Sequence, residues 1–256
     1  MNIKLYVAAL AAAAIVPAAS ASIVISPGTG TSMALGYQEA GSSQAVVYDN
    51  QTGDLDAAAG NMSVQDSAGS ASPDFTGTFS AYTTSTSSSS ILQGLQLAFR
   101  NTGLTQKTIT IEVTEVGFNV PQGNSVSLLN ELSGTITNAG GSVIAPDNVT
   151  FTSYADPANG WGTTPNGTPT STYNATPSLP SSPLQSFAEP TTMTTFSTSG
   201  SYSLTDVLTI TLSGGASANI SDTTQTVAAP EPASLAMLGL GGAGLLLVRR
   251  RKIAKA

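Results

Sequence analysis

Apolar and polar residues alternate over residues 107–120, and this alternation predicts β-structure. Isoleucine or valine occupies positions 109, 111 and 113, and threonine or glutamate fills the positions between them, which is the period of a half-buried strand. The apolar parity then shifts to 116, 118 and 120. A regular strand would turn Glu115 inward, so we expect a bulge or turn near Thr114–Glu115.

Other segments repeat the two-residue period, and together they predict an antiparallel β-sandwich. Residues 91–100 end at the turn signal Asn101-Thr102-Gly103, and we expect them to form a hairpin with 107–113. Residues 201–213 form another strong strand, in which Asp206 interrupts the buried face and is expected to mark a bend. Weaker strands are expected at 23–26, 44–48, 75–82, 125–129, 134–137 and 148–154. Many short strands with Gly- and Ser-rich turns favour a mostly β exported domain of the sandwich class.

Two segments lack this pattern. Residues 83–90 consist only of Thr and Ser and are expected to be a polar loop. Residues 156–190 hold seven of the 14 prolines and are expected to be a long loop, which is unusual inside a compact domain. A surface loop, a mobile lid and a glycosylated insert are the three interpretations, and the Ser/Thr/Pro composition favours the insert.

The only tryptophan of the chain, Trp161, lies in this long loop. An exposed Trp can stack on the face of a sugar ring, so Trp161 is a candidate for glycan binding. The plainer interpretation is that Trp161 packs the loop onto the sheet.

The first 21 residues have the pattern of a secretory signal peptide. Lys4 precedes an apolar run over 5–16, and Ala19 and Ala21 form a small-residue exit, so we expect export through the Sec translocon and cleavage after Ala21. The chain has no cysteine, which excludes a lipid-anchored cysteine and a disulfide framework. The exported domain, expected over residues 22–228, is long enough to form its own core.

The tail over residues 229–256 combines three features. Residues 233–248 carry no charge and are rich in Leu, Ala and Gly; as a transmembrane helix they would span about 24 Å, which is short for a hydrocarbon core of roughly 30 Å. A basic cluster at 249–252 follows, and it orients the tail because such residues stay on the cytoplasmic side. Pro230 and Pro232 hold Glu231 in an extended segment just outside the membrane. The cluster consists of Arg249, Arg250, Arg251 and Lys252.

This order of features closely resembles the PEP-CTERM sorting signal, over about a tenth of the chain. The resemblance implies that Pro230-Glu231-Pro232 is the motif at which exosortase, a membrane-embedded transpeptidase-like enzyme, processes its substrates. It also implies a Gram-negative bacterium that makes extracellular polymeric substance. An ordinary C-terminal anchor that is never cut is the alternative interpretation of the tail.

Charge and composition exclude several classes of activity. The exported part has only two basic residues, Arg100 and Lys107, against 14 acidic ones, so repulsion disfavours nucleic acid as a partner. The chain has no His and no Cys, which excludes Ser-His-Asp triads, Cys-His pairs and most zinc sites. A Ser-Lys dyad would have to use Lys107, and nothing nearby in the sequence would desolvate it.

Paired carboxylates are the catalytic arrangement that the composition still allows, as in a glycoside hydrolase. Glu112 and Glu115 are the closest glutamates in a structured region, but their odd spacing sends them to opposite faces of a regular strand. We therefore expect a solvated Glu112 and a Glu115 at the bulge rather than a catalytic pair.

Calcium is the one metal that the sequence raises. Asp49, Asp54 and Asp56 lie on a loop that contains Gly53, and clustered oxygen ligands suit Ca²⁺. The spacing does not match an EF-hand, and an Asp/Asn-rich hairpin turn is the favoured interpretation.

The leading hypothesis from the sequence is an exported protein without catalytic activity or cofactor. It would be held briefly in the inner membrane, processed by exosortase, and then join the cell surface or the exopolysaccharide matrix. The alternative is a secreted carbohydrate-binding module, and a carboxylate-based glycoside hydrolase is less favoured.

Overall fold

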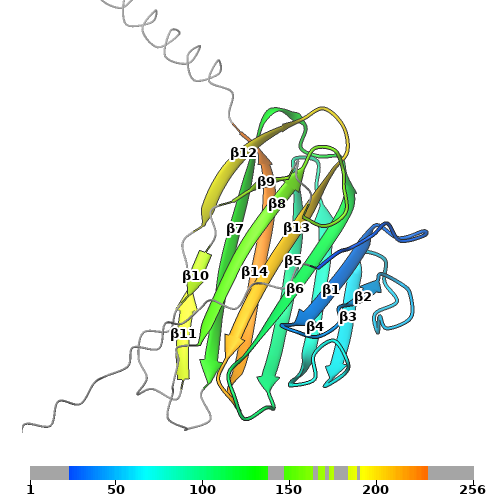
Figure 1. Cartoon of the computed structure of the whole chain (residues 1–256). Coiled ribbons are helices and arrows are strands. Elements are labelled where there is room, and N and C mark those ends of the chain that lie inside the picture. Colours follow the sequence, from blue (N-terminus) through cyan, green and yellow to red (C-terminus); the bar gives the residue numbers. More distant parts are fainter. Residues whose placement is uncertain are drawn as a thin grey trace, which may run out of the picture.

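The structure is a computed structural model that describes residues 23–137, 147–163, 167–170, 173–175, 184–188 and 191–229. Two antiparallel sheets pack face to face (Figure 1). Sheet A has the strand order β10-β8-β13-β6-β1-β2, and β9 also pairs with β8. Its strands are β1 (Met33–Glu39), β2 (Ala45–Tyr48), β6 (Lys107–Phe118), β8 (Asn148–Asp156), β9 (Thr168–Pro169), β10 (Tyr173–Ala175) and β13 (Tyr202–Leu212).

Sheet B has the order β11-β7-β14-β5-β4-β3, and β12 also pairs with β7. Its strands are β3 (Asn61–Ser67), β4 (Phe75–Ser85), β5 (Ser89–Asn101), β7 (Gly123–Thr137), β11 (Leu184–Ala188), β12 (Thr192–Thr198) and β14 (Ser217–Ala228). The predicted antiparallel β-sandwich is therefore confirmed.

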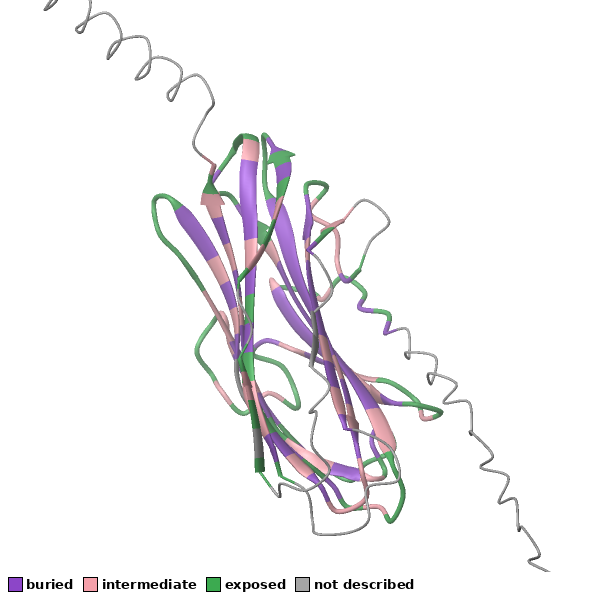
Figure 2. Cartoon of the chain, turned by 90° about the vertical axis from the view of Figure 1, so that its left-hand side faces the viewer, coloured by how far each residue is buried: buried purple, intermediate pink, exposed green. Residues whose placement is uncertain are grey.

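The hydrophobic core fills the space between the sheets, because the apolar parity of each long strand points toward the opposite sheet. Ile109 and Ile111 of β6 and Leu208 and Ile210 of β13 are buried in one continuous cluster with residues of sheet B. Aromatic side chains join the layers: the rings of Tyr37 on β1 and Phe79 on β4 stack with their centroids 4.9 Å apart. In Figure 2 the buried positions run along both sheets for the length of the sandwich. Complete burial of such a side chain contributes about 1.5–3 kcal/mol.

The expected hairpin between 91–100 and 107–113 is wrong. β5 pairs with β4 and β14 in sheet B, whereas β6 pairs with β1 and β13 in sheet A. The turn at 102–106 therefore crosses from one sheet to the other. Alternation shows which face of a strand is buried, but two strands that bury complementary faces can pack across the core as well as pair side by side.

Other boundaries also differ from the expectations. Residues 23–26 are not a strand; Ile23 and Ile25 instead pack with Ala34 on the outer face of sheet A. The loop expected at 83–90 shrinks to 86–88, because β4 and β5 extend into it. Residues 156–190, expected to be a loop without strands, contribute three short strands, β9, β10 and β11.

The expected irregularity in β6 is present a little later than predicted. The register against β13 shifts between Glu115 and Phe118, and Gly117 has a positive φ of 91° there, a value that glycine adopts at little cost. Glu115 accordingly points inward. The bend expected at Asp206 is wrong, because the register of β13 runs unbroken from Leu204 to Leu212.

Candidate functional site

The sorting motif begins directly at the end of a central strand. β14 lies between β5 and β7, and its last residue, Ala228, pairs with Val126. The backbone N–H of Ala229 still donates to the carbonyl of Ser125 at 3.2 Å. In the sequence Pro230 is the next residue. No flexible linker therefore separates the sandwich from the motif.

Several sequence-predicted positions lie outside the described residues. These are the signal-peptide exit Ala19 and Ala21, the motif Pro230-Glu231-Pro232, the apolar segment 233–248 and the basic cluster 249–252. In the part of the chain that the structure describes, no helix has the length and hydropathy needed to cross a bilayer.

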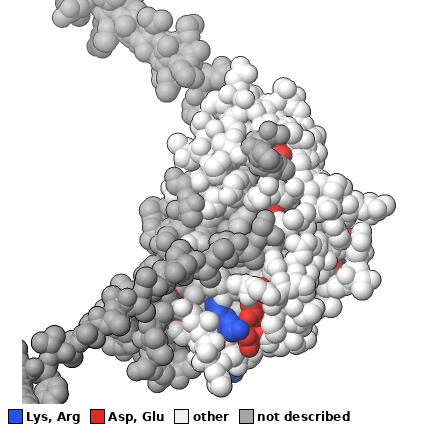
Figure 3. All heavy atoms as spheres, in the orientation of Figure 1, with Lys and Arg blue, Asp and Glu red and all other residues white. Residues whose placement is uncertain are grey.

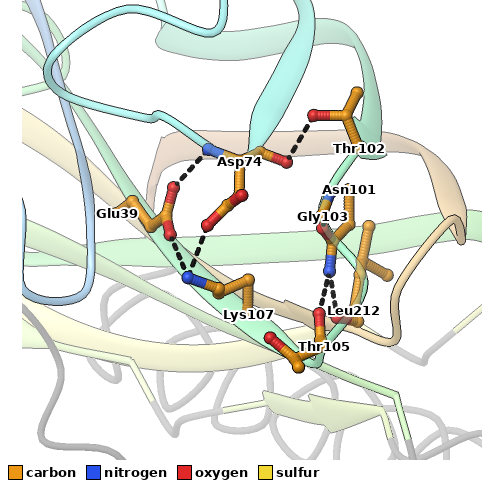
Figure 4. A network of polar contacts seen from close by, with 8 residues as sticks. All are labelled: Glu39, Asp74, Asn101, Thr102, Gly103, Thr105, Lys107 and Leu212. Carbon is orange, nitrogen blue, oxygen red and sulfur yellow. Dashed lines mark hydrogen bonds and ion pairs between the residues drawn. The ribbon is translucent and has the colours of Figure 1, made fainter.

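Lys107 takes part in a network of polar contacts at the end of the sandwich opposite Ala229 (Figure 4). Its Nζ lies 3.2 Å from Glu39 Oε1 and also contacts Asp74 Oδ2, and the Asp74 N–H donates to Glu39 Oε2 at 2.9 Å. The hydrogen bonds to Asp74 and Glu39 raise the pKa of Lys107. A catalytic lysine base needs the opposite shift, so the geometry disfavours a Ser-Lys dyad.

Asn101 holds the neighbouring turn in place. Its Nδ2 donates to the carbonyl oxygens of Thr105 and Leu212, both at 2.8 Å. One buried amide thereby ties the crossover 102–106 to the end of β13 (Figure 4).

Trp161 packs the 157–163 segment against sheet A. Its ring meets Tyr48 edge to face at a centroid distance of 6.3 Å, and it covers the small cluster of Ile23, Ile25 and Ala34. The side chain is half-buried. This geometry favours the interpretation that Trp161 anchors the segment to the sheet.

Glu112 is buried on the outer face of sheet A, so the expectation of a solvated Glu112 is wrong. Its side chain is only 3% exposed, because residues 161–163 lie over it. The N–H of Thr163 donates to Glu112 Oε1 at 3.1 Å. Burial raises the pKa of Glu112 to about 7, and this hydrogen bond opposes the shift. Gly162 has a φ of +70°, and a Cβ there would lie 2.8 Å from Glu112 Oε1. The segment 161–163 therefore needs glycine at this position to pass over Glu112.

Glu115 lies on the inner side of the same strand. Burial raises its pKa to about 7, a hydrogen bond with Ser32 lowers it, and the charge of Asp49 raises it further. Glu115 Oε2 has no hydrogen-bond partner among the described residues. Glu112 and Glu115 are thus separated by the sheet itself, and they do not form a catalytic carboxylate pair.

A buried pair of aspartates was missed as a pair by sequence reasoning. Asp206 of β13 and Asp222 of β14 point into the interior and are 3% and 4% exposed. Thr224 donates to Asp206 Oδ1 at 2.5 Å, but Asp206 Oδ2 and Asp222 Oδ1 lack partners among the described residues. Gly94 leaves the room that Asp222 occupies, since a Cβ there would lie 2.1 Å from Asp222 Oδ1. The sequence did contain a signal for the burial of Asp222: it continues the every-second-residue pattern of Ala218 and Ile220, which point inward. The pattern was missed because the strand β14 was not predicted from the sequence.

Burial is the main cause of the unusual titration of this pair. It raises the pKa of Asp206 to about 7, and it raises the pKa of Asp222 well above its usual range, where the charge of Asp206 adds to the effect. Both groups are closed off from solvent, so the pair acts on the stability of the fold rather than on a substrate.

Asp49, Asp54 and Asp56 serve as hydrogen-bond acceptors in turns. Asp49 Oδ2 accepts from the N–H of Gly60 at 3.0 Å, Asp54 Oδ1 accepts from the N–H of Ser63 at 2.9 Å, and Asp56 Oδ1 accepts from the N–H of Ala58 at 2.9 Å. Among the described residues no group of three or more acidic side chains is arranged to hold a metal ion. The geometry thus favours the turn interpretation of this loop.

A shallow groove crosses the outer face of sheet B. Its volume is about 570 Å³, and it extends over β4, β5, β14, β7 and β11. Phe187 contributes to one side of the groove and is half-buried, because it also packs against the hydrophobic core. Hydroxyl and amide groups line the floor. The lining residues are Thr78, Ala98, Ser133, Gly134, Thr135, Phe187, Asn219, Ile220 and Ser221. None of these side chains is charged, so the groove suits a neutral polar ligand.

Comparison with known proteins identifies the class of the C-terminal region. The PEP-CTERM protein-sorting motif matches residues 228–252. The chain therefore carries a PEP-CTERM sorting motif, and the match begins at the last residue of β14. This motif marks an exported protein that depends on exosortase.

The exported domain has no comparably informative match. A solved structure of a carbohydrate-binding module from the β-sandwich superfamily is similar to 70% of this chain, with 10% sequence identity and a TM-score of 0.29. This chain spans 64% of that structure's chain. The likeness is too distant to assign a ligand. No curated protein is significantly similar to the chain in sequence.

Proposed function

We propose that this protein is a non-enzymatic component of the cell surface or of the exopolysaccharide matrix of a Gram-negative bacterium. Export would proceed through the Sec translocon, and the tail would hold the protein in the inner membrane until exosortase acts at Pro230-Glu231-Pro232. The mature sandwich would then be released to the surface. The match to the sorting motif at 228–252, joined without a linker to a closed domain, carries this proposal.

The absence of a catalytic role rests on the surroundings of the acidic side chains. Glu112 and Glu115 are buried on opposite sides of sheet A, and the Asp206–Asp222 pair is sealed in the core. A hydrolase would need two carboxyl groups that reach a common substrate.

The sorting step is tested by the intact mass of the protein recovered from the cell envelope and the medium. We expect the wild-type chain to end near residue 230 and Glu231→Ala to retain residues 233–256 in the inner membrane. Glu189→Ala is the matched control, because Glu189 also precedes a proline, and we expect it to be processed normally. Retention of the tail by all three proteins would contradict exosortase processing and leave an ordinary anchor.

The groove on sheet B supports a second candidate function, which is binding of a neutral polysaccharide. A partly exposed aromatic ring beside hydroxyl and amide groups is a common way to bind sugars. We expect Phe187→Ala to abolish binding to matrix polysaccharide in a pull-down, and Trp161→Ala to retain it because Trp161 packs on the opposite sheet. Loss of binding in Trp161→Ala alone would instead favour Trp161 as the stacking residue. If the wild type and both variants bind the polysaccharide equally weakly, the protein has a purely structural role.

A further inference from the structure

At the end of the sandwich where the described chain stops, the turns 86–88, 119–122, 157–160 and 199–201 contain no charged side chain. Together with Ala229 we call these turns the C-terminal tip. The loop 49–60 joins β2 and β3 at the same end of the strands and carries Asp49, Asp54 and Asp56, but it lies on the outer strands of the two sheets, away from β14. The turns are composed of Ser, Thr, Asn, Gln, Gly, Pro, Ala and Val, and most of their residues are exposed. Asp156, which precedes the turn 157–160, is buried and accepts from the N–H groups of Ala158 and Gly160 at 2.8 and 3.2 Å.

Strand pairing shows that these turns belong to one surface. Tyr202 pairs with Phe118, Ser203 with Asp156, Thr198 with Gly123, and Val227 with Ser89. The hydroxyl of Tyr202 donates to the carbonyl of Val120 at 2.5 Å, and its 2.7 Å hydrogen bond with Thr226 Oγ1 of β14 ties the two sheets together there. A hollow of about 650 Å³ opens in the same surface, lined by Gln122, Gly123, Asn124, Pro157 and residues 197–200. The tip forms the upper end of the sandwich in Figure 1.

The opposite end carries the basic side chains. Arg100 and Lys107, the two basic residues of the exported part, lie there with Glu39 and Asp74. In Figure 3 the basic side chains appear only near the lower end of the molecule, and the uppermost loops are white. The exported part nevertheless has 14 acidic residues against two basic ones, so a neutral tip is not a consequence of a weakly charged domain.

The length of the connecting chain brings the tip close to the membrane. Only Pro230, Glu231 and Pro232 separate Ala229 from the apolar segment that begins at Ala233. Four residue steps reach at most about 14 Å, whereas the interfacial layer on one side of a bilayer is roughly 5–8 Å thick. The tip therefore lies within about one headgroup layer of the lipid surface while the tail is in place.

The charge of a protein surface determines whether it can approach a membrane that contains anionic lipids. Acidic side chains within about 8 Å of a surface that contains anionic lipids are repelled at physiological ionic strength. An uncharged tip avoids this repulsion, and its hydroxyl and amide groups can exchange water for lipid headgroup oxygens.

We propose that the C-terminal tip is a docking surface for the lipid headgroups of the membrane, against which the sandwich stands upright until the tail is cut. This inference rests on the proposed function, because it needs the tail to be a membrane segment. Docking fixes the sandwich, and with it the sorting motif, at a constant height above the bilayer.

The absence of cysteine from the wild-type chain makes single-cysteine labelling clean. Ser87→Cys and Ser199→Cys place a fluorophore on exposed positions of the tip, and Thr105→Cys places one on an exposed turn at the far end. β14 has 12 residues, so the two ends are roughly 40 Å apart. The full chain is reconstituted into phosphatidylethanolamine–phosphatidylglycerol vesicles that contain lipid with a spin label on its headgroup.

We expect strong quenching at positions 87 and 199 and none at 105. A twelve-residue Gly/Ser insertion after Ala229 adds about 20 Å of reach, and persistent quenching in that variant would show that the tip itself prefers the lipid surface. The double variant Ser87→Glu/Ser199→Glu, with the label at Gln122→Cys, should lose quenching on anionic vesicles and keep it on purely zwitterionic ones. Thr105→Glu is the matched control, and it should leave the quenching unchanged on both anionic and zwitterionic vesicles.

Weak quenching at all positions of vesicle-bound protein would overturn the docking proposal and leave the sorting function intact. Loss of tip quenching on insertion of the linker would also overturn it, because tethering alone would then explain the proximity. Energy transfer between tip labels of different copies would assign the surface to a second copy of the chain instead. Failure of the full chain to bind vesicles at all would contradict the proposed function itself.

Discussion

Asp206 on β13 and Asp222 on β14 face each other across the interior of the sandwich, and each leaves one carboxyl oxygen without a hydrogen-bond partner among the described residues. Like charges buried side by side repel, so the folded protein holds at least one of these groups protonated near neutral pH. The packing of the two sheets at this point is therefore more stable when the pair carries a proton.

We predict that the domain is more stable at pH 5 than at pH 8. Burial raises the folded-state pKa of Asp206, Glu112 and Glu115 to about 7. A raised carboxyl pKa means that the folded state binds more protons than the unfolded state. The resulting stabilisation is present below the unfolded-state pKa, near 4, and is lost as the pH rises through about 7. Thermal melting at the two pH values measures it, and a higher melting temperature at pH 8 would contradict it.

The Asp206–Asp222 pair should cause part of the loss of stability between pH 5 and pH 8. We expect Asp206→Asn/Asp222→Asn to reduce the loss of stability between pH 5 and pH 8, because the amides of similar size do not ionise. Asp54→Asn is the matched control, since Asp54 accepts backbone hydrogen bonds in a turn at the surface. A double variant with the wild-type pH dependence would show that the pair does not titrate in this range.

Glu112 is predicted to hold the 161–163 segment against sheet A. Glu112→Ala removes the acceptor for the Thr163 N–H and leaves a cavity, so we expect a loss of about 1–3 kcal/mol in stability. Trp161 is the only tryptophan, and its fluorescence should shift to longer wavelength as the segment loosens. Glu112→Gln keeps an acceptor oxygen and should leave the emission unchanged. An unshifted spectrum in Glu112→Ala would mean that Trp161 is held by its apolar contacts alone.

Tyr202 is predicted to be the strongest single polar link between the sheets at the tip. Its hydroxyl donates to the carbonyl of Val120 and lies 2.7 Å from Thr226 Oγ1, and the residue is fully buried. Tyr202→Phe removes both contacts, although Ser90 still bonds Val120 and Thr226. The substitution should therefore cost about 0.5–1.5 kcal/mol, measured by urea unfolding. Tyr48→Phe removes a hydroxyl that bonds Ser26 in an exposed setting and should cost much less. Equal effects of the two substitutions would contradict the role of Tyr202.

Arg100 and Lys107 are the two basic residues of the exported part. We predict that removing the charge of Lys107 lowers the free energy of unfolding more than removing that of Arg100. Lys107→Met removes the cation beside Glu39, whose carboxylate is buried, while the Lys107 side chain itself is 34% exposed. Solvent screening reduces the roughly 3–5 kcal/mol typical of a fully buried pair, and we expect a cost of about 1–2 kcal/mol. Arg100 is exposed, and Arg100→Met should change the free energy of unfolding by less than about 1 kcal/mol. Similar effects of the two variants would show that Glu39 finds another partner.

The sequence by itself was sufficient for the features that depend on local period and order. The alternation at 109, 111 and 113 identified β6 and its buried face, and the shift of parity located the irregularity near Glu115 to within a few residues. The sorting motif was also readable, because a proline–glutamate–proline element, an apolar run and a basic cluster are defined by their sequence order. These features need no knowledge of distant neighbours.

Only the tertiary structure decided which strands are neighbours. β5 and β6 follow each other in the chain but lie in different sheets, and β14, which sequence reasoning did not identify, pairs with both β5 and β7 at the centre of sheet B. Polar residues on its inner face, Asp222, Thr224 and Thr226, concealed its buried character. Their burial depends on partners such as Asp206 and Tyr202, which lie far away in sequence.

Contacts with residues far away in sequence also explain why Glu112 was wrongly expected to be solvated. Its position on the polar side of an alternating strand predicted exposure, but residues 161–163 fold back over it. The neutral tip likewise arises from four turns that are remote in sequence and converge only because strand pairing aligns their ends. Period and composition report on one strand at a time, whereas burial, pKa and surface charge are set by what the rest of the chain places around each residue.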